Sequence, residues 1–321
     1  MTNPLTDNRH HEQRRYVDSI VMKNSFKIKI PCSTSNLGPG FDTLGLALQL
    51  FLEIEVSTAT EKTEFVLSGE GKDALPLDES NYIYKIYCQG CEIIGATPRS
   101  LHIKVRSDIP LSRGLGSSGS AVVAALVMAN ELNGGSLTRD QIAEIATRIE
   151  GHPENVSASC YGGLTVGCLA NEKLFSCQIL PQESLKAVTV IPEIEILTRE
   201  ARTLLPEHVP FAVAVNNVQR ATLFAAAMAT GQFDVLREAS KDKLHQPFRK
   251  KLIPGFDALL ESAYEAGALA AFLSGSGSTI VALVQENASR VEDAMLSSVA
   301  SFNYSASART LDIAREGYRV D

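Results

Sequence analysis

The sequence lacks several features that would define its surroundings. It contains no tryptophan, and aromatic residues make up only 6% of its 321 residues. No stretch approaches the ~18–20 consecutive apolar residues that span a membrane. Acidic side chains (37) outnumber basic ones (30), and the formal net charge of −7 argues against a general nucleic-acid-binding surface. We therefore expect no membrane and no nucleic-acid partner, and an anionic ligand would need a local site.

Cysteine is also scarce, with six scattered residues. The one close pair is Cys88-Gln89-Gly90-Cys91. A zinc site needs a second pair of ligands at matching spacing, and a redox C-x-x-C motif begins a helix. This pair instead lies inside a helical pattern from Tyr82 to Ile94. We expect both thiols to be structural, and the protein to be cytoplasmic, where thiols stay reduced.

Length and periodicity predict about two domains. Residues 1–25 are polar and lack the apolar core of about 7–15 residues that a signal peptide needs, so they are predicted to be a disordered extension. Strand and helix patterns follow without strict β–α alternation, which predicts an α+β fold. Because the pattern changes near residue 185, we expect one domain over 26–185 and a second over 186–321.

One loop combines glycine and serine at unusual density. It follows an alternating, strand-like run, Leu101–Val105, and leads into an apolar helical segment, Ala121–Leu132. Exposed backbone N–H groups at a strand-to-helix turn, together with a helix N-terminus, form an anion site, most often for phosphate. A simple serine-capped glycine turn would need one glycine and one serine, not three of each. The predicted phosphate loop comprises Pro110, Leu111, Ser112, Arg113, Gly114, Leu115, Gly116, Ser117, Ser118, Gly119 and Ser120.

Three familiar glycine-loop chemistries do not fit this segment. A P-loop needs a lysine after its last glycine, and none is present. Gly114, Gly116 and Gly119 match G-x-G-x-x-G, but a dinucleotide site then needs a strand ending in an acid, and here a second helix follows. The H-R-D and D-F-G motifs of protein kinases are absent. A nucleotide phosphate without a lysine needs Mg²⁺, held by a hydroxyl and a carboxylate. Ser118 and Glu144 could meet across two antiparallel helices, although Glu144 could equally be a solvated surface acid.

The loop, read as P-x-x-x-G-L-G-S-S, resembles the phosphate-loop signature of the GHMP kinase family. Gly119 lies where alanine is commoner, but the family accepts small residues there. The resemblance extends from about Phe26 onward and is closest to the branch that phosphorylates homoserine. Five further segments carry it: residues 30–42, 150–155, 198–202, 245–255 and 274–279.

The resemblance implies a two-lobed α+β fold, with an N-terminal nucleotide-binding lobe and a C-terminal ferredoxin-like α/β-sandwich lobe. It implies an enzyme that uses ATP and Mg²⁺ to phosphorylate the hydroxyl of L-homoserine, a step towards threonine, and it leaves a homodimer open. The alternatives are another small-molecule kinase of the family, acting on mevalonate or a sugar, or a dinucleotide-binding oxidoreductase that uses Gly114-x-Gly116-x-x-Gly119.

The resemblance also implies a role for particular residues. Ser118 and Glu144 would hold Mg²⁺, and Glu144 and Asn155 would serve catalysis. Arginine forks suit a substrate carboxylate, and Asp42 or Asn36 could accept from its ammonium group. Glu154 replaces the usual aspartate, so we expect catalysis by positioning and charge stabilisation rather than by a base. Asn81 and Tyr82 are candidate adenine contacts. The predicted substrate residues are Asn36, Asp42, His152 and Asn155 near the hydroxyl and amino groups, and Thr198, Arg202 and Arg249 at the carboxylate.

Overall fold

The computed structural model describes residues 23–59 and 61–321. Of the extension predicted over residues 1–25, all but the last three residues lie outside this part of the chain. The first strand already begins at Ser25.

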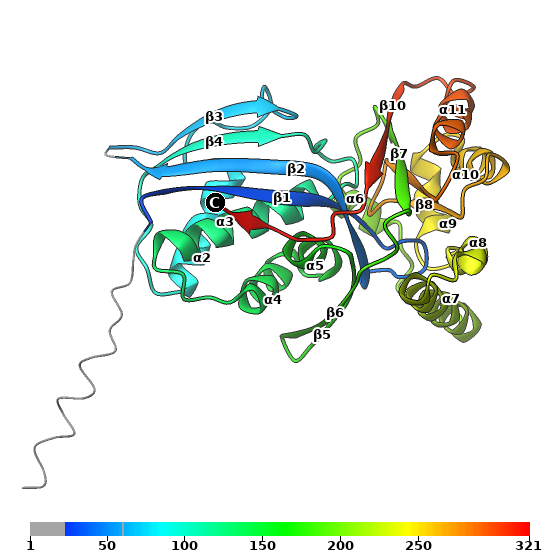
Figure 1. The fold of residues 1–321 in the computed structure, drawn as a ribbon, viewed down its shortest axis with the longest axis horizontal. Helices are drawn as coiled ribbons and strands as arrows, with labels where there is room; N and C mark the ends of the chain where they lie inside the picture. The colour runs from blue at the N-terminus through cyan, green and yellow to red at the C-terminus, as the bar shows by residue number, and fades with distance from the viewer. Residues whose placement is uncertain (1–22, 60) are drawn as a thin grey trace, which may run out of the picture.

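The first lobe is built on a seven-stranded sheet (Figure 1). Its strands are β1 (Ser25–Ser35), β2 (Leu44–Thr58), β3 (Glu64–Gly69), β4 (Leu101–Ser107), β5 (Leu164–Ala170), β6 (Lys173–Ile179) and β11 (Arg319–Val320). Five strands lie in the order β11-β1-β2-β4-β3, and the β5–β6 hairpin pairs with β2. Among the strands that the structure describes, β3 and β4 are the one neighbouring pair in this sheet that runs parallel. In β1, Phe26, Ile28 and Ile30 are buried while Lys27 and Lys29 are exposed, the period of two expected of a strand with one covered face.

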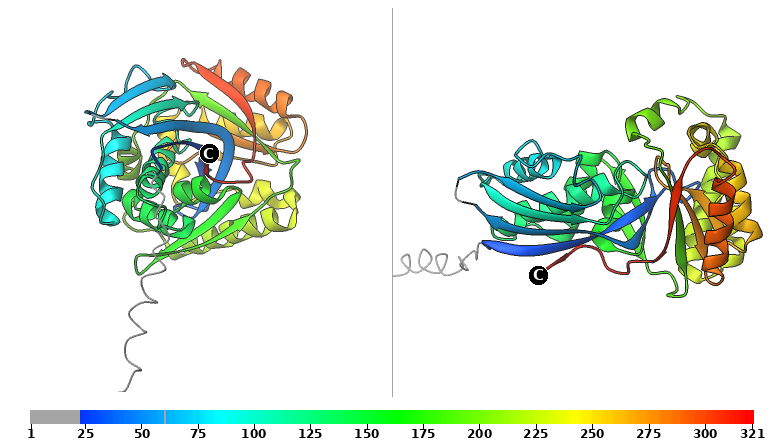
Figure 2. Two further views of the ribbon diagram at one scale, coloured as in Figure 1. Left: turned by 60° about the vertical axis from the view of Figure 1, so that its left-hand side comes forward. Right: turned by 90° about the horizontal axis from the view of Figure 1, so that it is seen from above.

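Helices cover one face of this sheet (Figures 1 and 2). They are α2 (Tyr82–Ile93), α3 (Ser117–Leu132), α4 (Arg139–Glu150) and α5 (Glu154–Tyr161). Helix α3 is buried along most of its length because its alanines and valines pack against both the sheet and the other helices. Thr138 and Gln141 form a capping box at the start of α4. Cys88 and Cys91 lie within α2 as free thiols, with Cys91 buried.

The second lobe contains a four-stranded antiparallel sheet with the order β10-β7-β9-β8. Its strands are β7 (Lys186–Pro192), β8 (Ala270–Leu273), β9 (Ile280–Val284) and β10 (Ala306–Asp312). Its helices are α6 (Thr198–Thr203), α7 (Phe211–Thr230), α8 (Leu236–Ala239), α9 (Gln246–Arg249), α10 (Phe256–Glu265) and α11 (Ala288–Val299), with short 3₁₀ turns η1 (Phe233–Val235) and η2 (Lys250–Leu252). This strand order, with a helical connection before β8 and another before β10, is ferredoxin-like, so the predicted α+β fold with two lobes is confirmed.

Strand β9 shows how this lobe is filled. Ile280, Ala282 and Val284 belong to the core that α10 and α11 form. Val281 and Leu283 belong to the other core, which includes residues of α7 and continues into the first lobe. Both faces of the strand are therefore covered, which explains its unbroken apolar sequence.

The end of the chain returns to the first lobe. Ile313 pairs with Leu48, and β11 pairs with β1. A single division at residue 185 therefore does not describe the sheets, because residues after 312 join the first one. Within residues 23–59 and 61–321, no helix is both long enough and apolar enough to cross a membrane.

Candidate active site

Three loops from distant parts of the sequence meet between the lobes. They are residues 36–43 after β1, residues 108–116 after β4, and residues 274–279 between β8 and β9. Ser274 Oγ donates to the Gly114 carbonyl at 2.6 Å, and Gly275 N donates to the Ser35 carbonyl at 3.1 Å. A Cβ on Gly114, whose φ is 78°, would lie 2.2 Å from the Ser274 carbonyl oxygen. Only glycine fits at this crossing.

A single cleft of about 940 Å³ runs along these loops and α6. One end has the geometry of an anion site. Gly116 begins α3 in the left-handed conformation, with φ of 70° and no side chain capping the helix, so the N–H groups of the first turn are free to bind a ligand. Residues 110–119 line the cleft. Ser120 does not, because it is buried and its Oγ donates to the Ser117 carbonyl at 3.0 Å.

The predicted pairing of Ser118 with Glu144 is wrong. Ser118 Oγ donates instead to Glu150 Oε1 at 2.7 Å. Glu144 forms an ion pair with Arg148, accepts from Leu174 N at 3.3 Å, and lines a separate groove beside the β5–β6 hairpin.

The error has a geometric cause. Helices α3 and α4 do run in opposite directions, so the end of α4 lies at the start of α3. Glu144 is six residues before that end, about 9 Å back along the axis and about 120° around it. Glu150, the last residue of the helix, is the one that reaches Ser118.

The other end of the cleft contains a compact charged group. Asp42 accepts two hydrogen bonds from Arg202, at 2.7 and 3.0 Å. Arg249 is only 2% exposed, and its Nη1 donates to the Gly275 carbonyl at 3.0 Å. Burial and the nearby charge of Arg202 lower the pKa of Arg249 to about 10, so it remains charged at neutral pH. Thr198 Oγ1 lies 3.5 Å from Ser276 Oγ at the same end.

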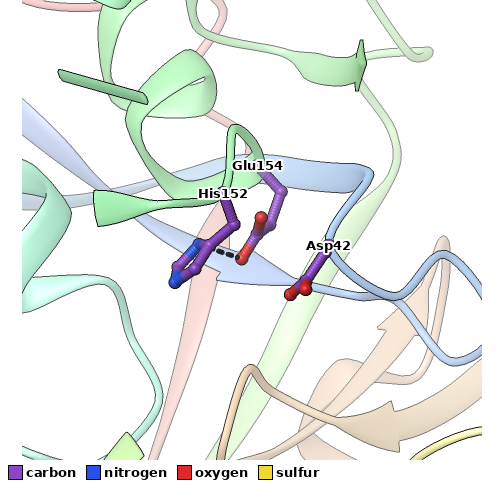
Figure 3. A group of neighbouring side chains, drawn as sticks. All are labelled: Asp42, His152 and Glu154. Atoms are coloured by element: carbon purple, nitrogen blue, oxygen red, sulfur yellow. Dashed lines mark ion pairs between the residues drawn. The ribbon is translucent and has the colours of Figure 1, made fainter. Parts of the chain in front are cut away.

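A second cluster joins the two ends. His152 Nδ1 lies 3.0 Å from Glu154 Oε1, which also accepts from Asn155 Nδ2 at 2.9 Å. The side chains of Asp42, His152 and Glu154 converge, with one candidate ligand atom from each within 4.8 Å of the others (Figure 3). Asn155 Oδ1 accepts from Ser33 Oγ at 2.8 Å and would lie 3.2 Å from a Cβ on Gly116. Asn155 is thus at the junction between the glycine loop and the charged group.

The groups of this cluster pair with one another and with Arg202. Burial disfavours a charged His152, but the hydrogen bond and charge of Glu154, helped by Asp42, outweigh it and raise the pKa of His152. Arg202 already donates to both oxygens of Asp42. Glu154 Oε2 is buried and has no hydrogen-bond partner among residues 23–59 and 61–321, so it is the acceptor left for a cationic group.

The side chains of two other predicted site residues, Asn36 and Asn81, form hydrogen bonds to the backbone. Asn36 Nδ2 donates to the Gly275 carbonyl at 3.1 Å, and its Oδ1 accepts from Asp42 N at 3.0 Å. Asn81 caps α2 by accepting from Ile83 N at 3.0 Å. Both side chains also line the cleft, together with Tyr82, which is 44% exposed.

Sequence reasoning missed Glu150 and Glu154 as site residues, although both lie in the segment 150–155 that it had singled out. The glycine loop gives no support to the dinucleotide alternative. Helix α3 is followed directly by α4 rather than by a strand with an acid at its end.

Known proteins with this arrangement are GHMP kinases. The sequence model described as the GHMP kinases N terminal domain matches residues 81–163, and the one described as GHMP kinases C terminal matches residues 214–301. A homoserine kinase of Persephonella marina is 40% identical over 296 residues, which cover 92% of this chain and 98% of the relative.

Solved structures of homoserine kinases are also similar to this chain. The homoserine kinase of Cytophaga hutchinsonii superposes with a TM-score of 0.83 and 26% identity, covering 94% of this chain and 98% of that one. A putative homoserine kinase of Listeria monocytogenes gives a TM-score of 0.74 and 29% identity, covering 92% and 99%. The chain belongs to the GHMP kinase family and, within it, to the homoserine kinases.

Proposed function

We propose that this protein transfers the γ-phosphoryl group of ATP to the side-chain hydroxyl of L-homoserine, in the cytoplasm and as a step towards threonine. The bond from the γ-phosphorus to the β–γ bridging oxygen breaks, and a bond from the homoserine oxygen to that phosphorus forms with release of the hydroxyl proton. The observation that carries the proposal is one continuous cleft. It joins a glycine loop at a helix N-terminus to a pocket that contains Arg202, Arg249 and the carboxylate of Glu154.

The glycine-loop end is the ATP site in this proposal. Residues 110–119 wrap the phosphates, and the free N–H groups at the start of α3 face their charge. Tyr82 lines the same cleft, and in this proposal it contacts the adenine.

Ser118 and Glu150 are the residues we propose for Mg²⁺. A hydroxyl and a carboxylate 2.7 Å apart, beside a phosphate loop without lysine, are the oxygen ligands that this ion takes. When bound, Mg²⁺ neutralises charge that develops on the transferred phosphoryl group.

The charged end receives homoserine. Arg202, Arg249 and Thr198 bind its carboxylate, and Glu154 Oε2, with Asp42 nearby, accepts from its ammonium group. Asn155 and His152 then lie towards the hydroxyl and the phosphate loop. Because Glu154 is paired with His152 rather than free to take a proton, the rate enhancement comes from positioning and electrostatic stabilisation.

A coupled assay of ADP release tests the substrate. L-homoserine should be turned over far faster than mevalonate, galactose or phosphomevalonate at equal concentration. Turnover of mevalonate or a sugar without turnover of homoserine would refute the proposal. A homodimer stays a prediction, to be checked by light scattering of the purified chain.

A further inference from the structure

Phe41 lies among the charged groups of the cleft, although it is an apolar residue. Its ring centroid is 5.1 Å from the guanidinium carbon of Arg249 and 5.4 Å from that of Arg202. The ring of His245 stacks on it at 5.2 Å, with 27° between the planes. One half-buried ring therefore contacts both arginines of the proposed carboxylate site.

Two guanidinium groups beside one another repel, and the protein offsets this only in part. Asp42 accepts both of its hydrogen bonds from Arg202. Arg249 is nearly fully buried, and within the described part of the chain its side chain donates only to backbone carbonyls, Gly275 at 3.0 Å and Ala201 at 3.4 Å. The face of an aromatic ring carries partial negative charge and attracts a cation within about 6 Å. No carboxylate among the described residues forms an ion pair with Arg249, so the Phe41 ring supplies an attraction that this guanidinium otherwise lacks.

The Phe41 ring stacks on His245, and hydrogen bonds fix His245 in place. His245 Nε2 lies 2.7 Å from the Gly38 carbonyl, and His245 is fully buried. Burial lowers the pKa of His245, so its imidazole is neutral and donates a hydrogen bond from Nε2 to the Gly38 carbonyl. Asp242 in turn accepts from the backbone N–H groups of His245 and Gln246, at 2.9 and 2.7 Å.

The loop around Phe41 is fixed at further points. Asn217 Nδ2 donates to the Pro39 carbonyl at 3.2 Å and to Asp242 Oδ1 at 2.6 Å. A Cβ on Gly38 would lie 2.0 Å from the Ser240 carbonyl oxygen, so the loop sits directly on that segment. The Gly275 carbonyl accepts from both Asn36 and Arg249. The position of the ring and the position of the arginine are thus set by the same framework.

We propose that Phe41 is a positioning residue for substrate recognition, an aromatic platform that holds Arg202 and Arg249 together in the geometry that binds a carboxylate. This inference rests on the proposed function, since it assumes that these arginines bind the homoserine carboxylate. Leucine at this position would fill similar space but would offer no π face to either guanidinium.

The test compares L-homoserine with L-homoserine amide, which lacks the carboxylate charge, using the full chain and the ADP-release assay. The quantity of interest is the carboxylate preference, the ratio of kcat/KM for the acid to that for the amide. Phe41→Leu should lower this preference about tenfold, mainly through KM for homoserine, and leave KM for ATP within about twofold. Phe41→Tyr, which keeps the ring, should retain the preference of the unmodified protein.

The matched control is Phe175→Leu, the same change at a ring that has Lys173 Nζ at 5.4 Å but lies outside the cleft. It should not alter the preference. Equal losses of activity towards acid and amide in Phe41→Leu, or an unchanged preference, would overturn the inference while leaving the proposed function intact. If the unmodified protein fails to turn over homoserine, or does not prefer the acid, the proposed function fails as well. Should Phe41→Leu not fold, Phe41→Met makes the same comparison.

Discussion

Replacing Glu150 by glutamine tests the proposal that Glu150, rather than Glu144, holds Mg²⁺ together with Ser118. The substitution keeps the size of the side chain and an oxygen that can accept from Ser118, but removes the negative charge. The partner variant is Glu144→Gln on the same helix. If Ser118 and Glu150 hold Mg²⁺, Glu150→Gln should damage catalysis and Glu144→Gln should not.

The expected size follows from the geometry. Two unit charges about 4 Å apart interact by about 4 kcal/mol at an effective dielectric constant of ~20, and a carboxylate that binds Mg²⁺ directly lies closer. Since the amide oxygen retains part of the interaction, Glu150→Gln should cost about 2–4 kcal/mol in the transition state, or about 30- to 1000-fold in kcat. The Ser118 hydrogen bond is solvent-exposed, so folding should lose about 1 kcal/mol at most.

Glu144→Gln should behave differently. It removes the i,i+4 ion pair with Arg148, worth about 0.3–0.5 kcal/mol, and keeps an acceptor for the N–H of Leu174. We expect kcat within about twofold of the unmodified protein. Both variants should be assayed over a range of Mg²⁺ concentrations, with thermal unfolding as the check on folding. A larger loss in Glu144→Gln than in Glu150→Gln, with both folded, would refute the reasoning.

Three further predictions concern the substrate pocket and the thiols. Arg249→Lys should raise KM for homoserine at least about tenfold and KM for ATP by less than about twofold, because a lysine cannot present forked donors; equal rises in both constants would count against the carboxylate role. Although burial opposes its charge, Glu154 raises the pKa of His152 above its ordinary 6.5, so the pair stabilises the fold fully below about pH 6.5 and this gain disappears as pH rises through the raised pKa. The melting-temperature advantage of the unmodified protein over His152→Gln should therefore shrink as pH rises above about 6.5, and an advantage that grows with pH would contradict this. Burial raises the pKa of Cys32 and Cys160 to about 12, whereas Cys168 and Cys177 are exposed. A thiol reagent should label the exposed pair in the native protein and reach Cys32, Cys91 and Cys160 only after unfolding, so rapid native labelling of Cys91 would show that α2 opens.

Some parts of the fold could be predicted because their causes are local. The capping box of Thr138 and Gln141 depends on residues three apart, and the structure forms it. The buried character of α3 follows from its own run of small apolar residues. Strands β3 and β11 carry little local signal, because β3 is short and largely exposed and β11 has only two residues. Their pairing partners, β4 and β1, define them as strands.

The sequence by itself determined the glycine loop and its chemistry, since a left-handed turn, free N–H groups and a following helix are all properties of neighbouring residues. Only the tertiary structure decided which acid meets Ser118, because the answer depends on where α4 ends against α3. It also decided that Asp42 pairs with Arg202, 160 positions later, and that Phe41 lies between the arginines and His245. Such contacts arise from the packing of whole lobes. The spacing of two residues along the chain does not say whether they lie close together in the folded protein.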